Sequence, residues 1–363
     1  MNTKKILSIL LGLGIFVLAI TLFLNRESGF IHESEKKLLR VHFMDVGQGD
    51  ATLLQGPDFT ILIDAGRHDR NDVVPYLIKQ NVQKIDLLIG THPHADHIGQ
   101  FPQVLDNFQV NEVWMSGDLH TTLTFERALD AIERTNAKYN EPRAGELYNI
   151  GSALLEVVHP TDVDGSLNDG SIVIKLNYID INILFTGDAE VWAEHQMLAG
   201  GFNLDSHILK LGHHGSNTSS TQDFLNLVNP ELAIYSAALG NRYGHPSNEV
   251  IRRLKNMDIV VLGTDKDGTI VIETDGESYS VAFDDLNLLE VPPKMGIDNI
   301  DNCIDINEAS QSELAVLTHV GSKRAIELIN NRPYSSLSEL TRISGISTAR
   351  LQDIIQQGKA CIE

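Results

Sequence analysis

Short apolar runs of four to seven residues recur through most of the chain and are separated by stretches with helical periodicity. Bounded apolar runs of this length predict buried β-strands. They cover residues 41–46, 59–64, 84–90, 153–158, 171–176, 181–185, 208–211, 232–235 and 259–262. Helical patterns cover residues 70–80, 122–136, 189–199 and 246–256. Strands with helices between them predict two β-sheets packed together and covered by helices on the outside.

The N-terminal residues follow a different pattern. An apolar segment runs from Ile6 to Leu24, which is about the length that a membrane helix needs. No small-residue cleavage site follows it, so residues 1–24 are predicted to form an uncleaved signal anchor. Lys4 and Lys5 before the segment favour a cytoplasmic N-terminus. The protein is then a single-pass cell-membrane protein with its remaining residues outside the cell, or a secreted protein if the segment is cleaved.

A third pattern begins after Pro292 and Pro293, which mark a linker. The residues that follow contain two similar halves, each with a helix, a tight turn near one glycine and a second helix. The predicted organisation is therefore a signal anchor (1–24), a spacer (25–38), a main domain (39–287), a linker (288–300) and a small all-α domain (301–363).

The only two cysteines, Cys303 and Cys361, lie near the two ends of the small domain. In an exported protein, an even number of cysteines placed in this way favours a disulfide that closes the domain. Two unrelated buried thiols are the alternative.

Composition limits the partners that the surface can attract. The chain has 363 residues with 28 basic and 49 acidic side chains, and its net charge is −21. A general basic surface for nucleic acid is therefore excluded. Binding of a polyanion would have to rely on metal ions or on local backbone amides.

Candidate chemistry concentrates in residues 91–97, Thr-His-Pro-His-Ala-Asp-His, directly after the apolar run 84–90. Pro93 excludes a helix through this segment, so the spacing is that of a loop. Imidazole nitrogens and a carboxylate that converge at one point form a site for divalent transition metals, zinc above all.

Other polar side chains also follow apolar runs. Sheets in α/β folds bring such strand ends together along one rim, where sites form. Because every candidate lies at the C-terminal end of a run, we expect a single site. The additional candidates are Asp64, His159, Asp188, His213 and His214.

The order of these residues resembles that of the metallo-β-lactamase fold, an αββα sandwich. Several motifs are similar to the exported hydrolase domain of the ComEC DNA-uptake proteins, and the resemblance covers roughly residues 39–285. The chain lacks the many membrane helices of the ComEC channel. The motifs are residues 43–50 (Phe-Met-Asp-Val-Gly-Gln-Gly-Asp), 168–171 (Asn-Asp-Gly-Ser), 186–188 (Thr-Gly-Asp), 210–216 (Lys-Leu-Gly-His-His-Gly-Ser), 243–246 (Tyr-Gly-His-Pro) and 263–265 (Gly-Thr-Asp).

The resemblance implies two divalent metal ions, with zinc favoured and manganese as the alternative. Such a pair can generate hydroxide near neutral pH and clamp a phosphoryl oxygen. Asp188 would bridge the two ions. The other implied ligands are His92, His94 and His159 for one ion, and Asp96, His97 and His214 for the other.

The remaining candidates are assigned supporting roles. Asp96, His213 and Asp64 form the predicted catalytic set: His213 would face the substrate as an acid or a phosphate contact, and Asp64 would orient the histidine loop. Asp50 would shape the site or cap a turn. His245 would lie near the site or simply on the surface.

The two halves of the small domain resemble the tandem helix-hairpin-helix motifs of ComEA-type DNA receptors. Such hairpins bind the DNA backbone through turn amides, without regard to sequence. Each turn here keeps one glycine where the family has two, and residues 301–363 carry six basic and eight acidic side chains. A structural or protein-binding module is therefore the alternative. The predicted DNA contacts are Val320, Gly321, Lys323, Gly345, Ile346 and Arg350.

These resemblances imply a membrane-anchored, extracellular phosphodiesterase that acts on DNA. Hydrolysis of another exported phosphodiester, such as a choline-phosphate or a nucleotide, is the first alternative, because the His-His-Gly-Ser element is similar to choline-phosphate esterases as well. A non-enzymatic protein that tethers DNA through the tail is the second. Zinc β-lactamases with a cysteine ligand are excluded, because both cysteines lie in the tail. Thioester and lactone hydrolysis stay open.

Overall fold

The computed structural model describes residues 38–283, 286–289 and, with short gaps, 304–362. The chain divides between Pro293 and Lys294 into two units, which are described separately. The predicted signal anchor, nearly all of the spacer, most of the linker and Cys303 lie outside the described residues. Within the described part of the chain, no helix is long and apolar enough to cross a membrane.

The described residues of unit 1 form two β-sheets. The first has the strand order β16 (Leu286–Leu289), β15 (Tyr279–Phe283), β14 (Ile270–Thr274), β1 (Leu39–Phe43), β2 (Thr52–Gln55), β3 (Thr60–Ile63), β4 (Lys84–Gly90), β5 (Gln109–Met115) and β6 (Lys138–Asn140). The second has the order β13 (Val260–Gly263), β12 (Leu232–Tyr235), β11 (Ile208–Lys210), β10 (Ile181–Phe185), β9 (Val173–Tyr178), β8 (Ala153–His159) and β7 (Leu147–Ile150).

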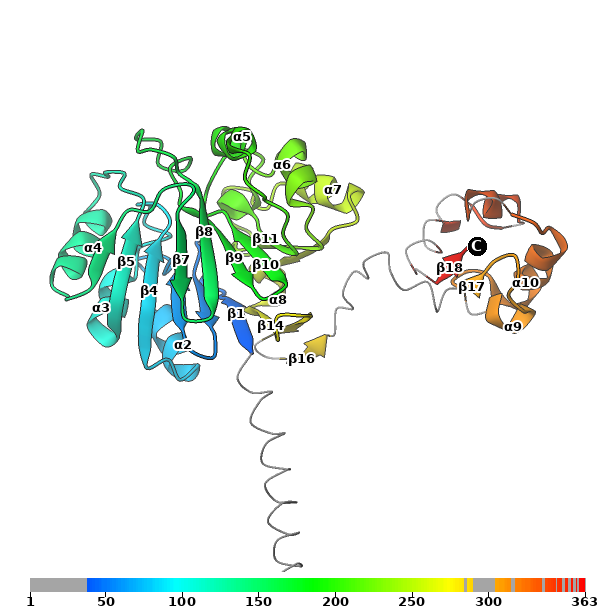
Figure 1. The fold of residues 1–363 in the computed structure, drawn as a ribbon, viewed down its shortest axis with the longest axis horizontal. Helices are drawn as coiled ribbons and strands as arrows, with labels where there is room; N and C mark the ends of the chain where they lie inside the picture. The colour runs from blue at the N-terminus through cyan, green and yellow to red at the C-terminus, as the bar shows by residue number, and fades with distance from the viewer. Residues whose placement is uncertain are drawn as a thin grey trace, which may run out of the picture. The chain divides into compact units, whose positions relative to one another are not determined.

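Helices cover the outer face of each sheet (Figure 1). The first sheet packs against α2 (Val73–Lys79), α3 (Phe101–Asn107) and α4 (Leu123–Glu133). The second packs against α5 (Val191–Gly200), α6 (Gln222–Val228) and α7 (Asn248–Asn256). This arrangement confirms the predicted αββα sandwich.

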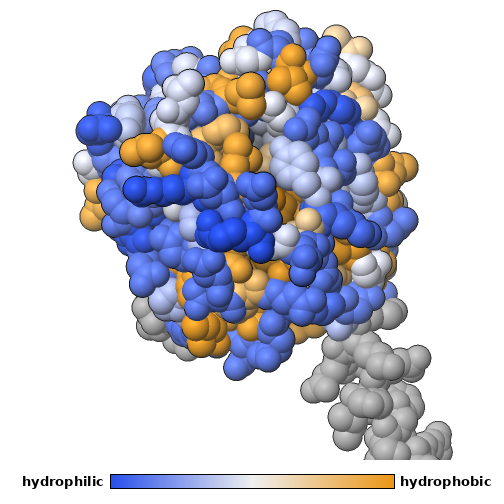
Figure 2. Space-filling model, turned by 90° about the vertical axis from the view of Figure 1, so that its left-hand side faces the viewer, coloured by the Kyte–Doolittle hydropathy of each residue, from blue (hydrophilic) through white to orange (hydrophobic). Residues whose placement is uncertain are grey.

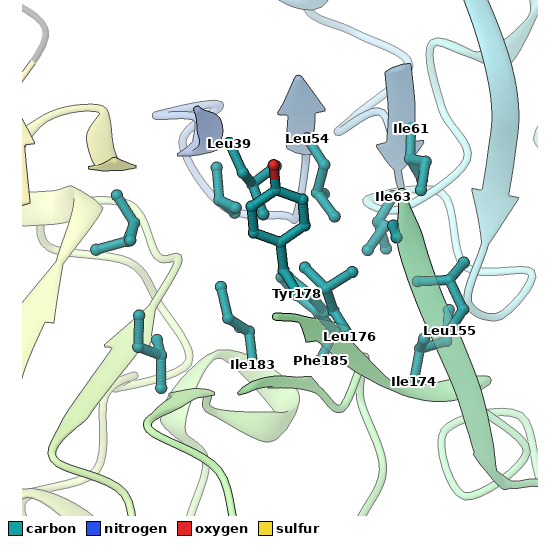
Figure 3. Packing of buried hydrophobic residues seen from close by; sticks show 14 of the residues in the cluster. Leu39, Leu54, Ile61, Ile63, Leu155, Ile174, Leu176, Tyr178, Ile183 and Phe185 are labelled. Atoms are coloured by element: carbon teal, nitrogen blue, oxygen red, sulfur yellow. The ribbon is translucent and has the colours of Figure 1, made fainter. Parts of the chain in front are cut away.

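The alternation of side chains along single strands explains the layers. Ile61 and Ile63 of β3 point into the core between the sheets, whereas Leu62 points to the helices. Ile183 and Phe185 of β10 enter the same central core from the opposite sheet. Figure 3 shows Ile61 and Ile63 on one side of this core and Ile183 and Phe185 on the other. Each fully buried side chain of this size stabilises the fold by about 1.5–3 kcal/mol relative to an exposed one.

Parallel pairing sets the position of the candidate residues. β3 pairs with β4 in parallel, and β10 pairs with β11 in parallel. The C-terminal ends of paired parallel strands lie at the same edge of their sheet, so the loops after these strands can meet.

The strand predicted over residues 41–46 ends earlier, at Phe43, because the chain turns through Gly47 and Gly49, which have φ angles of 69° and 143°.

Polar side chains cover most of the face of the molecule in Figure 2, and apolar ones lie scattered between them. This distribution agrees with a chain in which 21% of the residues are charged.

Unit 2 has a small core of its own, formed by residues such as Ile306, Leu314, Leu328 and Leu340. Among its described residues the structure shows β17 (Ile304–Asp305), α9 (Gln311–Leu314), α10 (Gly321–Asn330), the 3₁₀ helix η3 (Leu337–Arg342) and β18 (Ala360–Cys361). β17 and β18 pair in parallel and bring the two ends of the unit together. Because Cys303 is outside the described residues, its pairing with Cys361 stays a prediction.

Candidate metal centre

Asp64 holds the histidine loop in place. It follows β3, has a φ of 59° and is 1% exposed. One carboxylate oxygen accepts hydrogen bonds from the Thr91 hydroxyl and from His97 Nδ1, both at 2.8 Å, and the other accepts the Thr91 backbone N–H at 2.8 Å. Burial raises the pKa of Asp64, although the charge of His97 opposes the shift. Asp64 therefore orients the loop and does not itself face the cluster.

Hydrogen bonds at Nδ1 direct the other ring nitrogen of three histidines toward a common point. His97 Nδ1 donates to Asp64, and His214 Nδ1 donates to the Ser236 carbonyl at 3.0 Å. His92 Nδ1 lies 3.2 Å from the Thr91 hydroxyl oxygen. With the proton on Nδ1, Nε2 of each ring is the nitrogen that can bind a metal ion when the ring is neutral, which is the arrangement of metal-binding histidines.

Asp188 lies at the centre of these rings. Its carboxylate oxygens are 3.6 Å from His92 Nε2, 3.3 Å from His97 Nε2 and 3.8 Å from His214 Nε2. His94 Nδ1 lies 2.9 Å from His92 Nε2, somewhat closer than the roughly 3.3 Å expected of two nitrogens on one tetrahedral zinc ion with bonds of about 2.0–2.1 Å. The Ser171 hydroxyl accepts a hydrogen bond from the Asp188 backbone N–H at 3.0 Å and fixes this position.

Two groups of metal-ligand atoms share Asp188. One contains His92 and His94, and the other contains Asp50, His97 and His214. Within each group the ligand atoms lie within 4.8 Å of one another.

Several of these atoms are buried without a hydrogen-bond partner among the described residues: His97 Nε2, His214 Nε2, Asp188 Oδ1 and Asp50 Oδ1. Unpartnered buried polar atoms are rare because their desolvation is not compensated. The donor set therefore fits divalent metal ions.

Charges within the cluster reinforce this fit. Burial alone would raise the pKa of Asp188, but the charges of His97, His214 and His92 outweigh it, and the pKa lies well below its usual value. Burial lowers the pKa of His214, but Asp188 and Asp50 raise it overall to about 10, so a metal ion would have to displace a proton from this ring. Burial and the charge of His97 hold the pKa of His92 well below its usual value. The central carboxylate thus stays ionised and attracts cations.

His159 is not brought into either group. It ends β8, is 1% exposed, and its Nε2 donates to the Asp169 carbonyl at 2.5 Å. That nitrogen is therefore occupied, so the three-histidine set predicted for one ion is not assembled in this arrangement. The Asp169 carboxylate accepts backbone hydrogen bonds from Glu190 and Ala193 at the start of α5, both at 3.0 Å.

The two adjacent histidines after β11 point in different directions. The short 3₁₀ turn η2 (Gly212–Gly215) gives His213 a φ of 47° and His214 a φ of 56°. His214 is buried in the cluster, whereas the His213 side chain is 24% exposed. His213 Nδ1 lies 2.8 Å from a Glu190 carboxylate oxygen, and its Nε2 lies 3.9 Å from Asp188 Oδ2.

A cavity of about 220 Å³ opens onto this cluster. Its presence means that a substrate can reach the central carboxylate from solvent. From the sequence, His245 could lie near the site or simply on the surface. In the structure it lines the wall of this cavity. The full lining is Gln48, His94, Asp96, Asp188, His213, His214, Tyr243 and His245.

The loop between β1 and β2 packs tightly against the histidine loop. The Asp50 backbone N–H donates to the Asp96 carbonyl at 3.1 Å. A Cβ atom at Gly49 would lie 2.4 Å from that carbonyl oxygen, so only glycine permits this approach.

Sequence reasoning missed Lys210, which is 3% exposed. Its Nζ donates to Asp50 Oδ2 at 2.8 Å and to the Leu211 carbonyl at 3.2 Å. Burial alone would raise the pKa of Asp50, but Lys210 and His214 outweigh it and the pKa lies below its usual value. A lysine inside the apolar run 208–211 was the available signal, because a buried charge needs a partner.

Replacing Lys210 with methionine should destabilise unit 1 by about 3–5 kcal/mol, because Asp50 would stay buried without its counter-charge. Urea denaturation of the variant measures the loss. Asp50→Leu added to Lys210→Met should recover part of it. Arg40→Ala is the matched control: the pair of Arg40 with Glu273 is exposed, so its loss should cost less than about 1 kcal/mol. Equal effects of the two single variants would contradict a special role for the buried pair.

Comparison with known proteins identifies the fold. The profile of the Metallo-beta-lactamase superfamily matches residues 44–238, more than half of the chain. The chain belongs to the metallo-β-lactamase superfamily. A helix-hairpin-helix motif matches residues 301–357. Membership in the metallo-β-lactamase superfamily confirms the predicted enzyme class, a metal-dependent hydrolase, and the second match confirms the predicted tail family.

Two longer relatives extend the resemblance. "ComE operon protein 3" of Bacillus subtilis is 29% identical over 250 residues, which are 63% of this chain and 32% of that protein. "Competence protein ComA" of Neisseria gonorrhoeae is 29% identical over 265 residues, which are 71% of this chain and 36% of that protein. The chain thus spans about a third of the length of these two relatives. They confirm the predicted resemblance to the ComEC family.

Two further proteins are similar to parts of this chain. A "Deoxyribonuclease" of a Thioalkalivibrio species is 46% identical over 61 residues, which are 17% of each protein. The solved structure of the metallo-β-lactamase fold protein YhfI from Bacillus subtilis is 14% identical, has a TM-score of 0.45, and covers 66% of this chain and 100% of YhfI.

Proposed function

We propose that the protein is a membrane-anchored, extracellular phosphodiesterase that uses two divalent metal ions and acts on DNA. The observation that carries this proposal is the pair of ligand groups that share Asp188 beside an open cavity. The membrane anchor rests on the apolar segment between Ile6 and Leu24.

One ion would be held by His92 and His94, with Asp188 as the bridge to the second ion. Because His159 is engaged by a backbone carbonyl, His92, His94 and Asp188 would leave room at the first ion for water or substrate. Imidazole-rich ligand sets favour zinc, and the carboxylates leave manganese as the alternative.

The second ion would be held by His97, His214 and Asp96. We assign Asp96 and not Asp50, because Asp96 Oδ2 lies 3.5 Å from the metal-facing Nε2 of His214. Asp50 Oδ1 lies 3.6 Å from Nδ1 of the same ring, and its other oxygen accepts from Lys210. Asp50 would therefore position His214.

The two ions, when bound, would activate a water molecule near neutral pH and neutralise charge on the phosphoryl oxygens. His213 would supply the acid. A Glu190 carboxylate oxygen accepts a hydrogen bond from His213 Nδ1 and another from the Thr218 hydroxyl at 2.7 Å. The other ring nitrogen of His213, Nε2, therefore faces the cavity. From there it would donate a proton to the departing oxygen of the phosphodiester.

The relatives' names and the tail support DNA as the substrate. The two longer relatives are named for competence and the ComE operon, and the shorter match is named a deoxyribonuclease.

The two halves of the tail contain the same side-chain contact. Arg324 donates to the His319 carbonyl at 2.8 Å, and Arg350 donates to the Gly345 carbonyl at 2.7 Å, each five residues back.

The predicted DNA contacts divide into two kinds. Val320 and Ile346 are buried, and their backbone amides donate within the turns to the Leu317 and Ile343 carbonyls. They would shape the turns. Exposed residues such as Lys323 would meet the phosphates.

The proposal is tested with purified protein loaded with zinc or manganese. Single-stranded DNA, double-stranded DNA and bis-p-nitrophenyl phosphate are offered in parallel. We expect hydrolysis of the small diester and of at least one form of DNA. Hydrolysis of the small diester and of phosphocholine esters without any cleavage of DNA would favour another exported phosphodiester.

Deleting residues 296–363 should weaken DNA binding by about tenfold or more and leave turnover of bis-p-nitrophenyl phosphate intact. The tail would raise the local concentration of DNA, whereas the metal cluster performs the chemistry. Fluorescence anisotropy with labelled DNA and a colorimetric assay measure the two effects. The fall of affinity with salt should be shallow, because few basic side chains displace counterions. Unchanged DNA affinity would favour a structural role for the tail.

A further inference from the structure

A loop that is hydrogen-bonded within itself lies beside the cavity. Residues 236–247 connect β12 to α7 and wrap around the side chain of Asn241. Its amide nitrogen donates to the Ala238 and His245 carbonyls at 2.9 and 2.5 Å, and its oxygen accepts from the backbone N–H groups of Tyr243 and His245 at 3.1 Å. The Ser247 backbone N–H donates to the Gly215 carbonyl at 2.8 Å, which ties the loop to the turn that carries His213 and His214.

This loop presents an aromatic ring at the mouth of the cavity. Tyr243 lines the same cavity as Asp188 and His213, yet it is 52% exposed. Its ring stacks on His245 with an interplanar angle of 10° and a centroid distance of 5.9 Å. The Arg242 guanidinium lies 4.9 Å from the ring centroid and donates to the Tyr243 hydroxyl at 2.8 Å. Both neighbours hold the ring in one orientation.

The chemistry of this arrangement discriminates between phosphodiesters. With a net charge of −21, the protein offers a polyanion no general attraction, so a nucleic-acid strand needs local contacts near the metal cluster. An exposed aromatic ring supplies one, because every nucleobase has a face that can stack. A quaternary ammonium would also favour an aromatic ring, but the Arg242 charge beside this ring repels a second cation.

We propose that Tyr243 is the stacking surface for a nucleobase next to the scissile phosphate, so that the site selects nucleic acid over phosphodiesters without a base. The inference rests on the proposed phosphodiesterase function and deepens it. Tyr243 acts on substrate binding and leaves the chemical step to the metal cluster and His213.

The test uses the full chain loaded with metal and substrates that differ only in the base. The p-nitrophenyl phosphate esters of thymidine, at the 5′ and at the 3′ oxygen, are compared with the same esters of the abasic sugar. The wild-type KM should be about tenfold lower for one thymidine ester than for its abasic counterpart, with similar kcat. Tyr243→Ala should raise that KM about tenfold and leave the abasic KM unchanged, and Tyr243→Phe should restore the wild-type value.

Tyr139→Ala is the matched control. Tyr139 is 48% exposed, lies on β6 with its hydroxyl donating to Glu141, and lines no part of this cavity. Its replacement should change neither KM. Equal KM values for thymidine and abasic esters in the wild type, or equal changes of both in Tyr243→Ala, would overturn the stacking role while the phosphodiesterase function stands. A lower KM for p-nitrophenyl phosphocholine than for both thymidine esters would also overturn it. Failure to hydrolyse any of the diesters would remove the proposed function as well.

Discussion

Replacing Asp188 with asparagine should lower metal content and hydrolysis together. The change keeps the size of the side chain but removes the negative charge that lies between His92, His97 and His214. Because a bridging carboxylate serves both ions, we expect bound metal to fall from about two ions per chain to one or fewer. Turnover of bis-p-nitrophenyl phosphate should drop on the order of 10³-fold or more, since the charge stabilisation from both ions weakens.

Elemental analysis of dialysed protein and steady-state kinetics measure these two effects. Asp106→Asn is a suitable control, because Asp106 is an exposed carboxylate on α3 whose partner is Arg134 at 3.6 Å. It should keep full metal content and full activity. A fully active Asp188→Asn variant with two bound ions would refute the bridging assignment.

The metal cluster could be predicted from the sequence because its residues follow strand ends. Asp64 follows β3, and His92 lies two residues after the end of β4. These strands pair in parallel, so a pattern along the chain translates directly into proximity in space. The same reasoning holds for Asp188 after β10 and His214 after β11.

Side chains that depend on long-range packing could not be predicted in this way. Lys210 pairs with Asp50 across 160 residues, and nothing near either residue indicates the other. Glu190 reaches His213 only because the start of α5 lies beside the η2 turn. The position of Tyr243 depends on the hydrogen bonds around the Asn241 side chain, which no local sequence pattern predicts.

His159 shows the limit of the strand-end argument. It ends β8 just as the other candidates end or follow their strands. Its ring nevertheless donates to the Asp169 carbonyl, because the segment that follows β8 returns close to the strand end. Position at a strand end thus brings a residue to the edge of the sheet, while the packing of the following loop decides where its ring points.

Replacing His213 with alanine should slow the hydrolysis of DNA by about 10²–10⁴-fold, the range that general acid–base catalysis contributes. The departing oxygen in DNA belongs to a sugar hydroxyl and needs a proton when the bond breaks. In bis-p-nitrophenyl phosphate the departing group is a stable anion near neutral pH and needs none. The variant should therefore lose far less activity on the small diester than on DNA.

This difference separates an acid from a metal ligand, whose loss would slow both substrates alike. Glu190→Gln gives an intermediate test, because the amide oxygen still accepts from His213 Nδ1 but is a weaker hydrogen-bond acceptor than the carboxylate. We expect it to slow DNA hydrolysis by about 10–100-fold, with little change in KM or in metal content. Comparing kcat on the two substrates at several pH values measures the effect. Equal losses on DNA and on the small diester would contradict a proton-donating role for His213 and would favour a direct role in holding metal or phosphate.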